Sequence, residues 1–258
     1  MPAALRTPRR TPASRLLAGL VLLGLAGPAR GASPPPARGA LELRAGGAWL
    51  DDTVPPSWES ARDRLQVELG ARWRPSPVVT LGLDLDAWRA DRHVDGRAEQ
   101  GPGDLRLLTD LRLWRPGAVE GRLAWWAKLP NADDEKELGT DETDLHFGLD
   151  LSRPQGPARL RARLGVAVLG DPRRATAQSW LPEGELEAHL RAGPVVPMTR
   201  LQATLGSEIL PAQATATLGL EGGCPWLWGA EGLLGLSPAA PDLGARAWFG
   251  WGIGCRSD

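Results

Sequence analysis

The chain lacks most of the residues and patterns that define metal-binding, disulfide-rich or helical membrane proteins. Its 258 residues include two cysteines, three histidines, two phenylalanines and no tyrosine. Beyond residue 31, no apolar run approaches the roughly 18 residues of a membrane-spanning helix, which excludes insertion by helices. Neither the cysteines nor the scattered histidines have the spacing of a metal site, so we expect no bound metal.

A strong excess of charge of either sign is also missing, because 30 lysines and arginines stand against 31 acidic residues. A nearly neutral chain without a basic stripe is a poor binder of nucleic acid. No glycine-rich loop leads from a strand into a helix, so nucleotide binding is unsupported and we expect no cofactor.

The first 31 residues have the pattern of a secretory signal peptide. Several arginines precede an apolar core at 16–26, which is too short to span a bilayer, and Ala29-Arg30-Gly31 suits cleavage. An amphipathic or disordered leader is the alternative. Cleavage would leave 25 basic against 31 acidic residues, a net charge of −6. We therefore expect a signal peptide at 1–31, a short proline-rich linker at 32–39 and one folded domain at 40–255.

What the chain does have is a regular alternation of apolar and polar residues from Leu81 to Val168. Successive side chains of a β-strand point to opposite faces, so this alternation gives each strand one apolar and one polar face. The apolar face of five such segments carries no charge and is formed by Leu81, Leu83, Leu85, Ala87; Leu105, Leu107, Thr109, Leu111, Leu113; Val119, Gly121, Leu123, Trp125, Ala127; Leu145, Phe147, Leu149, Leu151; Leu160, Ala162, Leu164, Val166 and Val168.

The opposite face of the same segments is strongly charged, with both signs present. Two interpretations stay open: the charges select a small solute in a lumen, or they pair across the lumen and fill it. The candidate lumen lining consists of Asp84, Asp86, Arg106, Asp110, Arg112, Glu120, Arg122, Lys128, Asp144, Asp150, Arg159, Arg161 and Arg163.

The connections between the strands show a second regular pattern, since short and long links alternate. Transmembrane barrels have this asymmetry, with tight periplasmic turns and longer outer loops. The alternation of short and long links is no longer clear after Leu210. The short links, rich in proline or glycine, lie at 75–77, 115–118, 153–157 and 192–197, and the long polar links lie at 51–62, 92–102, 130–143 and 170–184.

Further segments alternate less cleanly and bring the total to about twelve strands, an even number as a closed bacterial barrel requires. Many reach the roughly 9–11 residues that a tilted membrane-crossing strand needs. We therefore predict an all-β fold: a transmembrane antiparallel up-and-down β-barrel in the outer membrane of a Gram-negative bacterium. The less clean segments lie at 40–49, 64–73, 185–191, 200–210, 213–221, 226–236 and 243–255.

The two cysteines fall near each other in this arrangement. Cys224 is at the start of the eleventh expected strand and Cys255 at the end of the twelfth, so both lie at the periplasmic rim. Because an exported chain meets an oxidising compartment, we expect a Cys224–Cys255 disulfide, with two unpaired thiols as the alternative.

Tryptophan is the main aromatic residue, and its positions fall into two groups. Trp88, Trp126 and Trp248 have the parity of the polar face, so we expect them in the lumen. The others lie on the apolar face near strand ends, where an interfacial girdle belongs. They are Trp49, Trp73, Trp226 and Trp251.

An ordered set of motifs covers roughly residues 101–170. Gly103-Asp104-Leu105 opens a strand, a later strand ends Lys128-Leu129-Pro130, and the polar loop that follows ends Leu138-Gly139-Thr140-Asp141-Glu142-Thr143-Asp144. The set resembles the outer-membrane β-barrel transporter family labelled "MetA-pathway of phenol degradation" and related uncharacterised barrel families. The resemblance implies an outer-membrane barrel of this size that passes small hydrophobic or aromatic compounds, and it implies no catalytic residues.

The remaining candidates for chemistry are few. Ser152 and Ser179 have no local motif that joins them to His93, His146 or His189, so we expect no enzymatic activity. One outer loop is acidic. It is simply solvated, or it binds divalent cations or contacts cation-bridged lipopolysaccharide, although it lacks the calcium-loop pattern. Its acidic residues are Asp133, Asp134, Glu135, Glu137, Asp141, Glu142 and Asp144.

The expected function is a passive channel or transporter for small molecules. A non-transporting structural or surface-interaction barrel is one alternative, and a soluble secreted β-barrel or sandwich that binds a lipid is another. The expected partners are outer-membrane lipid and lipopolysaccharide, the barrel-assembly machinery and a small-molecule solute, without nucleic acid.

Overall fold

The structure is a computed structural model that describes residues 39–53, 62–93, 95–115, 117–133, 135–136, 138, 142–170, 178–191, 194–206, 211–223 and 225–254. The predicted signal peptide and nearly all of the predicted linker lie outside these residues. Cys224 and Cys255 also lie outside them, so the disulfide stays a prediction. Within the described ranges, no helix is long and apolar enough to cross a membrane.

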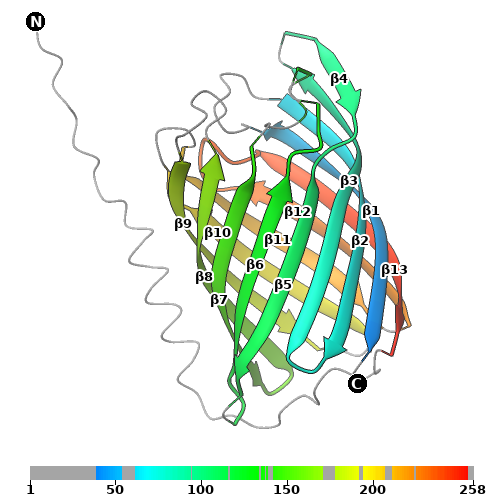
Figure 1. The fold of residues 1–258 in the computed structure, drawn as a ribbon, viewed down its shortest axis with the longest axis vertical. Coiled ribbons are helices and arrows are strands. Elements are labelled where there is room, and N and C mark those ends of the chain that lie inside the picture. Colours follow the sequence, from blue (N-terminus) through cyan, green and yellow to red (C-terminus); the bar gives the residue numbers. More distant parts are fainter. Residues whose placement is uncertain are drawn as a thin grey trace, which may run out of the picture.

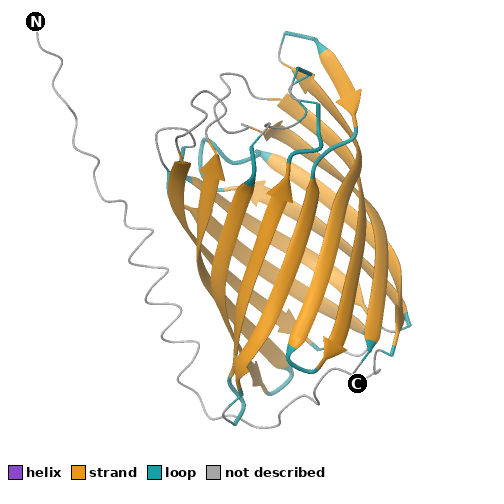
Figure 2. Ribbon diagram, in the orientation of Figure 1, coloured by secondary structure: helices purple, strands orange, loops and turns teal. Residues whose placement is uncertain are grey.

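Twelve antiparallel strands form one closed barrel (Figures 1 and 2). Each of the twelve pairs with the barrel strands before and after it in sequence, β3 with β5 included, and β1 closes the sheet by pairing with both β2 and β13. Among the described residues, β4 pairs with β3 alone and extends above the barrel as a hairpin. The strands are β1 (Ala40–Thr53), β2 (Arg62–Ser76), β3 (Val79–His93), β4 (Ala98–Gly101), β5 (Leu105–Trp114), β6 (Glu120–Leu129), β7 (Asp144–Gln155), β8 (Ala158–Gly170), β9 (Gln178–Leu190), β10 (Val195–Thr204), β11 (Gln213–Gly222), β12 (Trp226–Gly235) and β13 (Leu243–Ile253).

Short turns join the strands at one end of the barrel. The β7–β8 turn contains Gly156 at φ 60°, a left-handed conformation that glycine adopts without steric cost. In the β2–β3 turn the Ser76 hydroxyl accepts hydrogen bonds from the backbone N–H groups of Val78 and Val79 at 3.3 and 3.2 Å. These local interactions explain why the tight turns could be predicted from sequence.

Several strand boundaries differ from the expectation. β9 begins at Gln178, so the last seven residues of the long link expected at 170–184 are strand, with Pro182 opposite Val166. The link expected at 92–102 is largely the β3–β4 hairpin, and β10 begins at Val195 within an expected turn. Proline and glycine marked these segments as connections, but pairing with long neighbouring strands kept them extended.

The two faces of the barrel have opposite chemistry. Large apolar side chains are exposed on the outside, as in the row Leu123, Leu149 and Leu164 that runs across β6 to β8. Ion pairs join strands that are not neighbours, such as Arg200 on β10 and Glu231 on β12. Side chains from such strands meet on the concave side of a closed sheet, so the charged face lines the lumen.

Burial is correspondingly inverted relative to a soluble protein. The largest fully buried side chains are Arg62, Leu138, Leu181, Asp86 and Asp91, of which three are charged. In a water-soluble domain such positions are apolar. The barrel therefore buries its polar groups in the lumen and leaves its leucines for a hydrophobic surrounding.

A β-bulge in β3 overturns one expected side-chain direction. Val67 of β2 lies opposite Trp88 and Glu68 lies opposite Asp86, so Ala87 is the extra residue. An extra residue reverses the parity of everything after it on the strand. Trp88 therefore shares the outer face with Val67, and the expectation that it faces the lumen is wrong.

Candidate functional site: the charged lumen

Asp150 on β7 is the centre of one group of lumen charges. It is buried and accepts hydrogen bonds from Arg161 and Arg163, both at 2.8 Å. The register places Asp150 opposite Arg163 on β8 and opposite Arg122 on β6. Four of the sequence-predicted lumen residues thus lie together on three adjacent strands.

A chain of ion pairs continues from β9 around the wall. Glu187 binds Arg200 at 3.0 Å, and Arg200 lies 3.6 Å from Glu231. Arg246 lies 3.6 Å from Glu231 and binds Glu68 at 2.5 Å. Of these five, the sequence pattern placed Glu187 on the lumen face and did not place the other four there, although each has the same alternating position in its strand as the charges that were identified.

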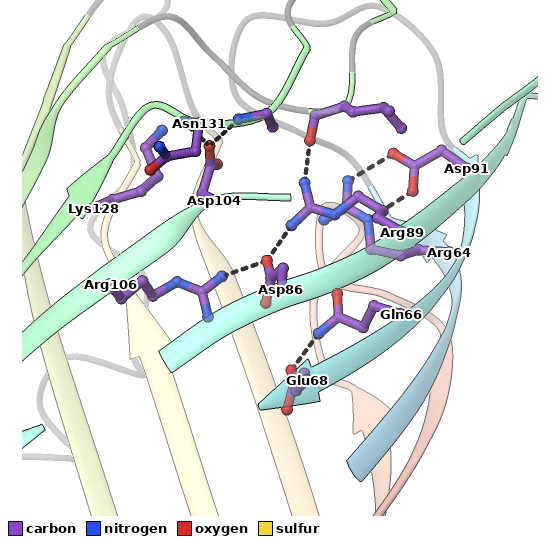
Figure 3. Close-up of polar contacts among 12 residues, drawn as sticks. Arg64, Gln66, Glu68, Asp86, Arg89, Asp91, Asp104, Arg106, Lys128 and Asn131 are labelled. Carbon is purple, nitrogen blue, oxygen red and sulfur yellow. Dashed lines mark hydrogen bonds and ion pairs between the residues drawn. The ribbon is translucent and has the colours of Figure 1, made fainter. Parts of the chain in front are cut away.

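A second group of charges lies where β3 extends toward the long-loop end of the barrel (Figure 3). Asp91 accepts from Arg64 at 2.9 Å and from Arg62 at 3.2 Å, and Asp86 accepts from Arg89 at 2.6 Å and from Arg106 at 3.2 Å. Because Ala87 is a bulge residue, Asp86 and Arg89 face the same side despite being three positions apart.

Two contacts bind the β6–β7 loop to this group (Figure 3). The Asp104 carboxylate accepts from the backbone N–H groups of Asn131 and Ala132 at 3.3 and 3.2 Å. Arg89 donates to the backbone carbonyl of Leu138, whose side chain is fully buried. The described part of the loop is therefore attached to the inner wall at this end.

The other sequence-predicted lumen residues also have neighbours of opposite charge or a polar group. Asp84 binds Arg72 at 2.7 Å, and Lys128 binds Asp144 at 2.7 Å. Asp110 lies opposite Thr80 in the β3–β5 register. Near the short turns, Glu120 binds Arg122 at 2.6 Å and lies 3.9 Å from Arg112. Arg159 donates to Ser152, which lies opposite Glu120.

Aromatic rings also occupy the lumen. Trp126 stacks on His146 with ring centroids 3.5 Å apart, and His146 contacts Glu183 at 3.1 Å. The guanidinium carbon of Arg44 lies 4.6 Å from the centroid of Trp248. Trp126 and Trp248 thus lie on the charged side, where their parity placed them.

The acidic loop is only partly described, since Asp134, Glu137 and Asp141 fall outside the described residues. Asp133 binds Lys136 at 3.1 Å, and the hydrogen bonds from Lys136 hold the pKa of Asp133 below its usual value. Within the described ranges, no group of three or more histidine, cysteine or acidic side chains could hold a metal ion.

Comparison with solved structures shows the fold. The translocator domain of the autotransporter NalP from Neisseria meningitidis is 12% identical with a TM-score of 0.51, and the match covers 93% of this chain and 94% of that chain. OmpF from Salmonella typhi, in a complex with daunomycin, is 8% identical with a TM-score of 0.39, covering 83% and 97%. No protein-family profile and no curated protein sequence matches the chain. The chain therefore has an outer-membrane-type β-barrel fold, and the family resemblance stays a prediction.

Proposed function

We propose that the chain resides in the outer membrane of a Gram-negative bacterium and passes small solutes passively through its lumen. The observation that carries the proposal is the combination of an apolar exterior with an interior lined by charges of both signs. Polar walls stabilise a hydrated path, whereas a soluble barrel would bury its leucines. Outer-membrane lipid, lipopolysaccharide and the barrel-assembly machinery are the partners that this location implies.

The mixed charge of the wall bears on the solute class. The family resemblance implies hydrophobic or aromatic compounds, for which the Trp126–His146 stack offers a flat aromatic contact. The surrounding ion pairs favour solutes that also carry polar or charged groups. We therefore propose small molecules with both an aromatic or apolar part and a polar group.

A non-transporting barrel is the second candidate, and one observation favours it. Arg89 and Asp104 attach the β6–β7 loop to the inner wall, and many lumen charges are already paired with each other. Interiors of modest barrels are often filled by their own side chains. A lumen that is closed to solutes would make this a structural or surface-interaction protein.

Fractionation and conductance together test the proposal. We expect the full-length protein to be recovered with the outer membrane, to show heat-modifiable gel mobility, and to form ion-conducting channels in planar bilayers. Recovery in the soluble periplasm would overturn the membrane location. Membrane recovery without conductance or liposome swelling would overturn transport and favour the structural barrel.

Charge reversal in the lumen tests whether the charged wall lines the conducting path. Arg161→Glu should lower the chloride-to-potassium permeability ratio severalfold, because it replaces a positive charge of the lumen wall with a third carboxylate. The Arg161 guanidinium lies 2.8 Å from Asp150 and 3.9 Å from Glu187. Reversal potentials in a salt gradient measure this ratio. Arg97→Glu on the exposed β3–β4 hairpin is the matched control, and equal ratios for the two variants would contradict the assignment.

A further inference from the structure

One region of the lumen has more guanidinium groups than carboxylates. It lies at the short-turn end of β5 to β8, where Glu120 is the first residue of β6. The Glu120 carboxylate is bound by Arg122 at 2.6 Å and approached by Arg112 and Arg115, each at 3.9 Å. One carboxylate, 11% exposed, is thus shared by three guanidinium groups.

A fourth arginine lies beside them without a carboxylate of its own. Arg159 on β8 is exposed and donates a hydrogen bond to the Ser152 hydroxyl at 3.4 Å, and Ser152 lies opposite Glu120. Among the described residues, no acidic oxygen lies within 4.0 Å of the Arg159 guanidinium. Arg161, two residues further along the same strand, adds another positive charge on the lumen face.

The sheet register supplies a second, independent observation. Arg112 and Arg122 lie directly opposite each other on β5 and β6. Like charges in directly opposed positions destabilise a sheet unless something between them is negative. Glu120 supplies part of that charge, and Asp150 on the neighbouring strand is already bound by Arg161 and Arg163. The positive charge of this region is therefore only partly neutralised.

From this arrangement we infer that Arg112, Arg122 and Arg159 form an anion-binding site at the short-turn mouth of the lumen. The ligand is a carboxylate or phosphate group on a small solute, because the planar guanidinium binds such groups through paired hydrogen bonds. Arg159 is the accessible member, and Glu120 competes with the incoming anion for the other two. That the bound solute is also transported rests on the proposed function, whereas binding itself does not.

Equilibrium binding of inorganic phosphate to the folded barrel in neutral detergent tests the site. We expect saturable binding that weakens as chloride concentration rises, because added salt screens the interaction. Arg159→Gln should weaken it about tenfold or more, since a charge-assisted hydrogen bond is lost. Arg97→Gln is the matched control, because it removes the same charge from an exposed position. No saturable binding, or equal affinities for the two variants, would overturn the inference.

Two further variants separate ligand binding from a structural role. Glu120→Gln should tighten phosphate binding, because it removes the competing carboxylate, whereas a purely structural role for the cluster predicts no gain. Arg159→Lys should lie between wild type and Arg159→Gln, since it keeps the charge and loses the paired donors. Heat-modifiable mobility confirms that each variant folds, and a Glu120→Gln affinity equal to or below wild type would contradict the site.

The failures of the two proposals are distinguishable. Conductance without saturable phosphate binding overturns the anion site and still supports the proposed channel function. Saturable binding that is sensitive to Arg159→Gln, in a barrel that does not conduct, supports the site and overturns transport.

Discussion

An arginine in place of Leu164 is expected to lower the free energy of unfolding of the barrel in a lipid bilayer by about 2–4 kcal/mol. Leu164 lies at the middle of β8, is 54% exposed and continues the outer row through Leu149 and Leu123. If this face meets the hydrocarbon core, a guanidinium there must leave water or distort the bilayer. Reversible denaturant unfolding in lipid vesicles measures the change.

The control for this prediction is the same substitution near a membrane interface. Leu243 is the first residue of β13 and is 50% exposed, so Leu243→Arg should cost about 0–1 kcal/mol. Equal costs at both positions would contradict the membrane assignment of the outer face. In detergent-free buffer a soluble barrel would tolerate either arginine alike.

Removal of the Asp91 carboxylate is the second change with a large expected effect. Asp91 and Arg62 have fully buried side chains, and Arg64 is 17% exposed. Asp91→Asn leaves two guanidinium groups facing each other without the charge between them. Breaking a buried ion pair from one side costs about 3–5 kcal/mol, and we expect about 3 kcal/mol here because Arg64 keeps some solvent contact.

Denaturant unfolding again measures this change, with Asp95→Asn as the control. Asp95 forms an exposed ion pair with Arg97, also on the β3–β4 hairpin, so its loss should leave stability unchanged within error. A similar result for both variants would show that the Asp91 cluster contributes no more than a surface pair. Proteolysis of the hairpin should become faster in Asp91→Asn if the effect is local.

Local rules account for the parts of this fold that were predicted well. Alternation placed Leu123, Leu149 and Leu164 on one face because the side-chain direction of a strand depends on sequence position alone. Turn chemistry at Gly156 and Ser76 located the tight connections. The error at Trp88 arose because a bulge is a property of pairing between two strands, and the sequence of β3 carries no sign of it.

The residues of the candidate site also fall into those that the sequence predicted and those that it did not. The alternation identified Asp150, Arg161 and Arg163 as lumen residues, and both arginines bind Asp150 in the structure. It did not identify Arg200, Glu231 or Arg246, since their contacts join strands that come together through the curvature of the closed sheet. The attachment of Leu138 by Arg89 likewise depends on how a loop folds over the wall.

An antiparallel membrane-type barrel with an apolar outside and a charged inside follows from the amino-acid sequence alone, because a two-residue period and the length of strands and turns are local properties. The tertiary structure decided which charges meet, which remain partly neutralised as around Glu120, and where the parity of a strand reverses. These outcomes depend on strand register and barrel closure. Both couple residues that are far apart in the chain, so they cannot be predicted from any single segment.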